Sequence, residues 1–272
     1  MYWIDERKGN CVLLICGFGT GSVQEMERTY GKLAEEARKA NPLVPVRRAL
    51  TSVKVIGRLH AGHGIRLPDV EGALEEIVND FTGAGNALQI RMMTVQVVGG
   101  REYEKLVAAA DTYSGKADIR LDQPLLAGPK LERLVDLLVE EAAAAPEEAI
   151  LYVGHGTHGR DPEGPAAYRR LEEIIRSRGE ENIFIGDLQT GITPVISALA
   201  QKNYRRVRLC SLMMVSGHHW TVDVSGDYKD SWKNMLADEG YEVSLRKTGL
   251  LERREVRDLL IEGDRYHYKI IT

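Results

Sequence analysis

Two histidine motifs follow apolar runs in the second half of the sequence. His155 lies between two glycines directly after the run Ala149–Val153, and His219 ends the segment Gly217-His218-His219, which follows the run Val207–Val215. Glycines beside a histidine let the backbone turn sharply and remove side chains that would crowd the imidazole. A single histidine after a strand is often only a polar loop residue. The recurrence of the pattern favours a functional site.

A third candidate, Glu102, comes from the first half of the sequence. It follows Gly99-Gly100 in the first turn of an expected helix, where the helix dipole favours an ionised carboxylate. Imidazole and carboxylate groups are the usual protein ligands of borderline divalent metals. His155, His219 and Glu102 would together hold such an ion and leave positions open for a substrate. We interpret His158 as a surface residue, although it could add a fourth ligand.

Other chemistries are less well supported by the motifs. The His155–His158 spacing lacks the glutamate of the zinc-protease motif His-Glu-x-x-His, and no Gly-x-Ser-x-Gly nucleophile motif is present. The loop Gly17–Ser22 joins a strand to a helix, but Ser22 stands where a dinucleotide fingerprint needs its third glycine. A nucleotide-dependent oxidoreductase is therefore only an alternative. The sequence also has no Gly-Lys-Ser/Thr element of an NTP-binding loop.

Expected strands alternate with expected helices along the whole chain. The strands are expected at residues 11–18, 44–50, 87–98, 119–126, 149–153, 183–185, 207–215 and 241–245, and the helices at 23–37, 53–59, 70–81, from 101, 130–144, 166–177, 193–200 and 230–237. This alternation favours parallel sheets with helices on both faces.

We therefore expect an α/β protein of two halves with a cleft between them. The segment Ala142–Glu148 marks the boundary between domains at residues 1–145 and 146–272, with the last helix free to pack back on the N-terminal half. In such folds, ligands bind beyond the carboxyl ends of the strands, where the histidine motifs are expected. The likeness of the two halves is architectural, since no residue-level repeat is visible.

The composition excludes several classes of protein. Hydrophobic residues make up 43% and charged residues 28%, and the net charge of −4 lacks the basic excess of a nucleic-acid-binding surface. Charges within Met1–Lys8 interrupt any signal-peptide core, and no stretch approaches the roughly 20 apolar residues that span a bilayer. We expect a cytoplasmic protein that binds neither nucleic acid nor membranes. The three cysteines predict buried, inert thiols and no disulfide scaffold.

Several short motifs, in order along the chain, are similar to those of one enzyme family. They are Phe18-Gly19-Thr20, Arg48–Ser52, Gly100–Lys105, Gly154-His155-Gly156, and the stretch from Gly217 through Gly226-Asp227 to Asp230–Lys233. Through these motifs the sequence resembles the anaerobic sirohydrochlorin cobaltochelatases of CbiK type, the class II chelatases of the cobalamin pathway.

The resemblance implies two Rossmann-like, chelatase-like domains with the active cleft between them. It implies a lyase that inserts Co²⁺ into sirohydrochlorin, or a close tetrapyrrole precursor, without nucleotide hydrolysis. Metal-handling and catalytic roles fall on His155, Glu102 and His219. The tetrapyrrole is expected to contact five residues in addition: Phe18, Gly19, Thr20, Arg101 and His218.

Some alternatives stay open within this family resemblance. His218 stands where relatives often carry an acidic residue, so either His218 or His219 could face the metal. No cofactor is implied beyond the substrate metal, for which Ni²⁺, Fe²⁺ or Zn²⁺ are alternatives to Co²⁺. A chelatase for another metal, a non-catalytic carrier of tetrapyrrole or metal, and a homo-oligomer are all compatible with the sequence. Arg47, Arg48 and Arg101 are candidates to meet the carboxylates of the substrate.

Overall fold

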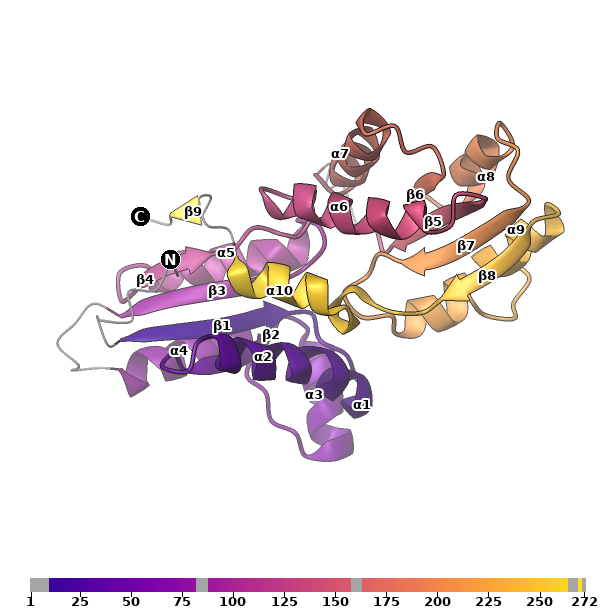
Figure 1. The fold of residues 1–272 in the computed structure, drawn as a ribbon. Helices are drawn as coiled ribbons and strands as arrows, with labels where there is room; N and C mark the ends of the chain where they lie inside the picture. Colours follow the sequence, from indigo (N-terminus) through magenta and orange to yellow (C-terminus); the bar gives the residue numbers. More distant parts are fainter. Residues whose placement is uncertain (1–9, 82–87, 158–162, 264–268, 271–272) are drawn as a thin grey trace. The chain divides into compact units, whose positions relative to one another are not determined.

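The computed structural model describes residues 10–81, 88–157, 163–263 and 269–270 (Figure 1). By their packing, these residues form two units: unit 1 comprises residues 1–130 and 256–272, and unit 2 comprises residues 131–255. The domain limits expected from the sequence, at residues 145 and 146, stay a prediction, since a packing unit is not a measured folding domain.

Unit 1 is built on a sheet with the strand order β2-β1-β3-β4-β9. Its strands are β1 (Cys11–Gly17), β2 (Val46–Leu50), β3 (Gln89–Val95), β4 (Asp118–Leu121) and β9 (Lys269–Ile270). The first four strands in this order are parallel, and β9 pairs antiparallel with β4. Every residue of β1 and β3 is buried, as expected for central strands covered by helices on both faces.

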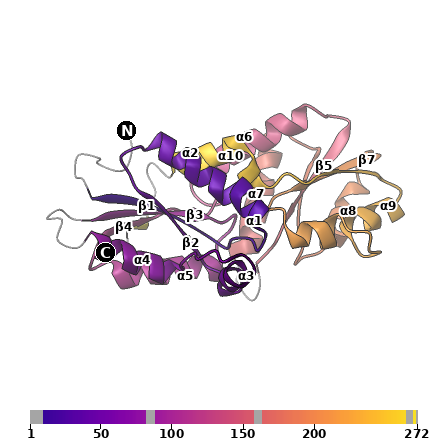
Figure 2. The ribbon, with the colours of Figure 1, turned by 90° about the horizontal axis from the view of Figure 1, so that it is seen from below.

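The helices of unit 1 lie on both faces of this sheet (Figure 2). They are α1 (Val23–Met26), the π-helical turn η2 (Glu27–Gly31), α2 (Lys32–Ala40), α3 (Val53–His63), α4 (Val70–Asp80), α5 (Arg101–Tyr113) and α10 (Arg254–Glu262). One face of the sheet packs against Leu74 of α4 and Leu106 of α5, while α2 and α10 cover the opposite face.

Unit 2 repeats this plan with a parallel sheet of order β6-β5-β7-β8. Its strands are β5 (Glu148–Gly154), β6 (Ile183–Asp187), β7 (Arg206–Ser211) and β8 (Glu242–Arg246), and its helical elements are α6 (Lys130–Ala143), α7 (Glu163–Ser177), α8 (Thr193–Leu199), the π-helical turn η3 (Trp220–Val224), α9 (Trp232–Asp238) and the 3₁₀ turn η4 (Leu250–Glu252). One face of the sheet is covered by residues of α8, η3 and α9, among them Leu199, Trp220 and Leu236.

The four parallel strands follow the same order in both units, which places a topological switch point in each sheet. In unit 1 the chain runs from β1 to the edge strand β2, and it then crosses back to β3 on the other side of β1. In unit 2 it moves from β5 to β6 and back to β7. Ligands of open α/β sheets bind in the crevice beyond the carboxyl ends of the strands that flank such a point. The loops after β1 and β3, and after β5 and β7, are therefore the places to look for a site.

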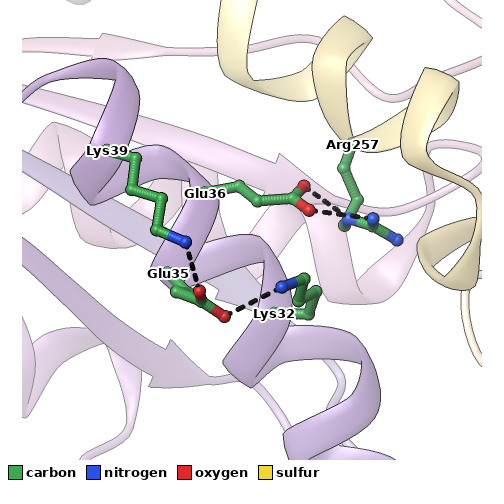
Figure 3. Close-up of polar contacts among 5 residues, drawn as sticks. All are labelled: Lys32, Glu35, Glu36, Lys39 and Arg257. Carbon is green, nitrogen blue, oxygen red and sulfur yellow. Dashed lines mark hydrogen bonds and ion pairs between the residues drawn. The ribbon is translucent and has the colours of Figure 1, made fainter.

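Two arginines attach α10 to the rest of unit 1. Arg257 lies on α10 and donates two hydrogen bonds to Glu36 of α2, at 2.6 and 3.0 Å, beside the ion pairs that Glu35 makes with Lys32 and Lys39 (Figure 3). A second arginine, Arg91 of β3, holds the carboxyl end of α10 from inside the unit.

The Arg91 side chain is 1% exposed and forms a buried ion pair with Asp122, at 2.6 Å. Its remaining guanidinium donors bond the carbonyl oxygens of Leu260 and Ile261, each at 2.7 Å. The last turn of a helix leaves carbonyls without intrahelical partners, and here a buried guanidinium supplies the donors for two of them.

The expected α/β fold of two halves with parallel sheets flanked by helices is confirmed. The limits differ in detail: the strand expected at 119–126 ends at Leu121, because the N–H groups of Leu125 and Leu126 turn back to the carbonyls of Gln96 and Val97. The antiparallel strand β9 was not expected.

No helix among the described residues is long and apolar enough to cross a membrane. Residues 1–8, Ala87 and His158 lie outside the described residues.

Candidate active site

The two histidine motifs lie at the switch point of unit 2. His155 follows β5 and His219 directly precedes η3, the helical turn after β7, and β5 and β7 are hydrogen-bonded neighbours. The two imidazole rings meet edge to face with their centroids 4.6 Å apart and an interplanar angle of 82°. The structure thus brings together two histidines that are 64 positions apart in the sequence.

The loop that carries His155 is fixed by its glycines and by a tyrosine. Gly156 has a φ of +79°, which side-chain-bearing residues rarely adopt. A Cβ on Gly154 would lie 2.5 Å from the hydroxyl oxygen of Tyr168. That buried hydroxyl accepts the backbone N–H groups of His155 and Gly156, and burial raises the pKa of Tyr168. The Tyr168 hydroxyl therefore stays protonated and anchors the turn that presents the imidazole.

His219 is oriented by a carboxylate one turn further along the chain. Its Nδ1 lies 2.7 Å from Oδ2 of Asp223, and both side chains are about half exposed. The ring of His218 is 5.9 Å from that of His219. Asp223 was not among the expected site residues, because no helical element is expected between the strand at 207–215 and the helix at 230–237. The i, i+4 spacing of a histidine and an acidic residue is a signal that could have found it.

Glu102 lies in unit 1, in the first turn of α5, at the switch point beyond β3. Its Oε1 accepts a hydrogen bond from Lys105 Nζ at 2.8 Å, and the same ammonium donates to the Thr51 carbonyl at 3.1 Å. Among the described residues, Glu102 Oε2 is buried and has no hydrogen-bond partner. A buried carboxylate oxygen in this state is costly unless a cation or a donor from a ligand completes it.

The loop Phe18–Thr20 directly follows the carboxyl end of β1. Phe18 is 50% exposed, so its ring is accessible to a ligand. Gly19 has a φ of +84° and donates its N–H to Tyr30 Oη at 3.1 Å. Thr20 Oγ1 donates to Oε2 of Glu25 at 3.0 Å.

The three candidate arginines differ in their surroundings. Arg47 forms an exposed ion pair with Asp80 at 3.1 Å, and a nitrogen of Arg48 lies 3.9 Å from a carboxylate oxygen of Glu27. Arg101 is exposed at the start of α5. Arg101 is therefore the best placed of the three to meet a carboxylate that is not part of the chain.

The two units share a residue-level motif that the sequence alone did not reveal. Phe18 lies between Gly17 and Gly19 after β1, as His155 does between its glycines after β5. In each unit the second glycine has a positive φ, and a tyrosine hydroxyl from the following helical segment bonds the loop backbone. The two halves were expected to resemble each other in architecture alone. They also share a repeated motif, in which a strand is followed by Gly-x-Gly and a tyrosine hydroxyl bonds the loop backbone.

No group of three or more His, Cys, Asp or Glu side chains within the described ranges already forms a metal-binding cluster. The structure brings His155 and His219 together, while Glu102 belongs to the other unit. The expected convergence of all three on one ion stays a prediction.

Comparison with known proteins identifies the family. A model of the cobalt chelatase (CbiK) family matches residues 11–266. The chain belongs to this family. Among curated members, the sirohydrochlorin cobaltochelatase CbiKC of Nitratidesulfovibrio vulgaris (strain Hildenborough) is 31% identical over 237 residues, which cover 84% of this chain and 80% of that protein. The family expected from the short motifs is confirmed, and with it the class of enzyme.

Two solved chelatase structures share the fold of this cobalt chelatase family member. The sirohydrochlorin chelatase SirB from Bacillus subtilis subspecies spizizenii, in complex with cobalt, has a TM-score of 0.60 at 10% identity and covers 92% of this chain and 91% of its own. SirB from Bacillus subtilis with Fe³⁺ has a TM-score of 0.64 at 12% identity, with 94% of each chain covered. At these identities the likeness concerns the fold alone.

Proposed function

We propose that this chain inserts Co²⁺ into sirohydrochlorin. The observation that carries the proposal is the pair of imidazoles of His155 and His219, 4.6 Å apart at the switch point of unit 2 in a member of the cobalt chelatase family. Its 31% identical relative is named a sirohydrochlorin cobaltochelatase. The metal is a substrate of the reaction, and no nucleotide or other cofactor is included in the proposal.

The reaction requires ligands that hold the metal weakly enough to release it. Inserting a divalent ion into the macrocycle displaces two pyrrole protons and strips the ion of its water. His155 and His219 would hold Co²⁺ near the ring nitrogens, and a neutral imidazole is also a suitable proton acceptor near neutral pH. We assign the second ligand to His219 and not to His218, because the ring contact to His155 is made by His219.

Glu102 is proposed as the third group that acts on the metal or on a pyrrole proton. Its support is the helix-start position and the buried Oε2, which has no partner among the described residues. Lys105 holds the other carboxylate oxygen and so fixes the orientation of the group.

Five residues are proposed to contact the tetrapyrrole. The exposed ring of Phe18 offers a flat apolar surface, and the exposed Arg101 and His218 offer positive or polar groups for carboxylates. Gly19 and Thr20 shape the loop that holds Phe18.

We place the reaction in the cytoplasm, in keeping with three free, buried thiols.

The test is a metal-insertion assay that follows the absorbance change of sirohydrochlorin with Co²⁺, Ni²⁺ or Fe²⁺. Replacing His155 or His219 by Ala should lower the rate with Co²⁺ by about 10²-fold or more, and Glu102→Ala should also lower it. His60→Ala, an exposed histidine of α3, is the matched control and should leave the rate unchanged.

Two outcomes would contradict the proposal. Full activity in both histidine variants would remove the proposed mechanism. Stoichiometric binding of metal or tetrapyrrole by the wild type, without turnover, would make the chain a carrier.

A further inference from the structure

We propose that Asp223 is a positioning residue, which holds His219 in the tautomer that presents Nε2 to the metal. This inference rests on the proposed function, because it concerns the same metal-handling histidine. It adds a residue that neither the sequence motifs nor the family resemblance singled out.

The hydrogen bond between His219 and Asp223 fixes the tautomer of the imidazole. A carboxylate can only accept, so the 2.7 Å contact between His219 Nδ1 and Asp223 Oδ2 requires the proton on Nδ1. The neutral imidazole then keeps its lone pair on Nε2, which has no hydrogen bond among the described residues. Metal-bound histidines typically donate their other ring N–H to a carboxylate or a carbonyl, which fixes both the tautomer and the ring plane.

The backbone of a π-helical turn holds His219 and Asp223 in place. His219 is the residue before the π-helical turn η3, and Asp223 lies within that turn. The Ser225 N–H bonds the Trp220 carbonyl five residues back, at 2.9 Å. Trp220 is 1% exposed and Val224 is fully buried, and both belong to the core of unit 2. One side of the turn is thus held in the core, and its other side carries the histidine and the carboxylate. Single π-helical turns of this kind often occur at functional sites.

A contribution to folding stability does not explain the pair of His219 and Asp223. His219 and Asp223 are 50% and 45% exposed, and ion pairs this exposed contribute only about 0–1 kcal/mol to folding. An orienting role does explain it, because a ring free to rotate would lose the edge-to-face arrangement with His155. The Nδ1 of His155 is itself 3.2 Å from the Gly156 carbonyl oxygen, so both histidines of the pair contact an acceptor through Nδ1.

The experiment uses the full chain without added metal. Long-range ¹H–¹⁵N correlation spectra of the imidazoles, recorded at about pH 8.5, where histidines are largely neutral, should show His219 with its proton on Nδ1. Asp223→Ala should shift this histidine towards the Nε2–H tautomer. Asp223→Glu keeps a carboxylate, which can only accept, and should preserve the wild-type tautomer. A purely structural role of Asp223 would not produce this difference between Ala and Glu.

The same variants are then titrated with Co²⁺ alone. Asp223→Ala should bind about 10–100-fold more weakly than the wild type, as for other outer-shell partners of metal-bound histidines, and Asp223→Glu should recover most of this loss. The control is Asp227→Ala, which removes a fully exposed carboxylate paired with Lys233 in the same stretch of chain and should leave Co²⁺ binding unchanged.

A wild-type His219 that carries its proton on Nε2, or an Asp223→Ala variant that binds Co²⁺ within twofold of the wild type, would overturn the inference. Failure of the wild type itself to bind Co²⁺ would count against the proposed function, and the tautomer measurement would still decide the role of Asp223.

Discussion

At the scale of single residues, the position of His155 depends on a neighbouring glycine, which has no side chain. Gly154 leaves room for the buried Tyr168 ring, whose hydroxyl accepts the N–H groups of His155 and Gly156. In unit 1, Gly17 leaves the same room for Tyr30, and burial raises the pKa of Tyr30 to about 12. The residue between the glycines differs, so one scaffold presents an imidazole in unit 2 and a phenyl ring in unit 1.

This arrangement predicts that Gly154→Ala is destabilising and also weakens Co²⁺ binding. The new Cβ would lie 2.5–2.6 Å from three atoms of Tyr168, a side chain that is only 6% exposed. Overpacking of this kind costs about 1–3 kcal/mol of unfolding free energy, measurable by urea denaturation. Gly57→Ala, in the middle of α3 with open space around it, should be neutral or stabilising by about 0.5–1 kcal/mol. Equal stability of the two variants would show that the Tyr168 contact does not constrain the turn.

At the scale of elements, α10 is a C-terminal helix that depends on buried charge. Arg91 joins three groups: the carboxylate of Asp122 and the carbonyls of Leu260 and Ile261. A buried ion pair is weak support for stability in itself, but removing one partner leaves the other charge buried and unpaired. The attachment of α10 is therefore more sensitive to Arg91 than to any exposed ion pair of unit 1.

Arg91→Met should accordingly lower the unfolding free energy by about 3–5 kcal/mol. The matched control is Arg47→Met, which breaks the exposed pair with Asp80 and should cost no more than about 1 kcal/mol. Urea denaturation compares the two variants, and limited proteolysis should cut Arg91→Met first near α10. Similar denaturation midpoints for both variants would mean that the Arg91 contacts do not hold this helix.

The sequence predicted the elements whose pattern is local and missed those that depend on distant partners. The run Cys11–Phe18 and the helical spacing in 70–81 gave β1 and α4 almost to the residue. The sequence left the last helix free to pack back on the N-terminal half, but the buried contacts that attach α10 could not be predicted, since Leu260 and Ile261 are about 170 positions from Arg91. The histidine motifs were located because each follows an apolar strand. Asp223 was missed because a π-helical turn has no hydrophobic period of its own.

At the scale of the whole molecule, both sheets have a buried thiol near their centre. Cys16 lies in β1 of unit 1 and Cys210 in β7 of unit 2, and both thiols are free. Burial raises the pKa of both thiols, that of Cys210 from 9.0 to about 12. The buried thiols expected from the sequence are confirmed. In the folded protein they stay protonated at pH 8, and they should react with thiol reagents only after unfolding.

These raised pKa values predict a loss of stability in alkali. The unfolded chain releases the Cys210 proton near pH 9, whereas the folded protein keeps it up to about pH 12. The contribution of this thiol to stability is therefore complete below pH 9 and declines as the pH rises through that window. At pH 10.5 the decline amounts to about 2 kcal/mol for one such group. Urea denaturation at pH 8 and at pH 10.5 measures it, and Cys210→Ala, which has no thiol to titrate there, should lose about 2 kcal/mol less than the wild type between the two values. An identical loss in both proteins would show that the Cys210 thiol is not protected by the fold.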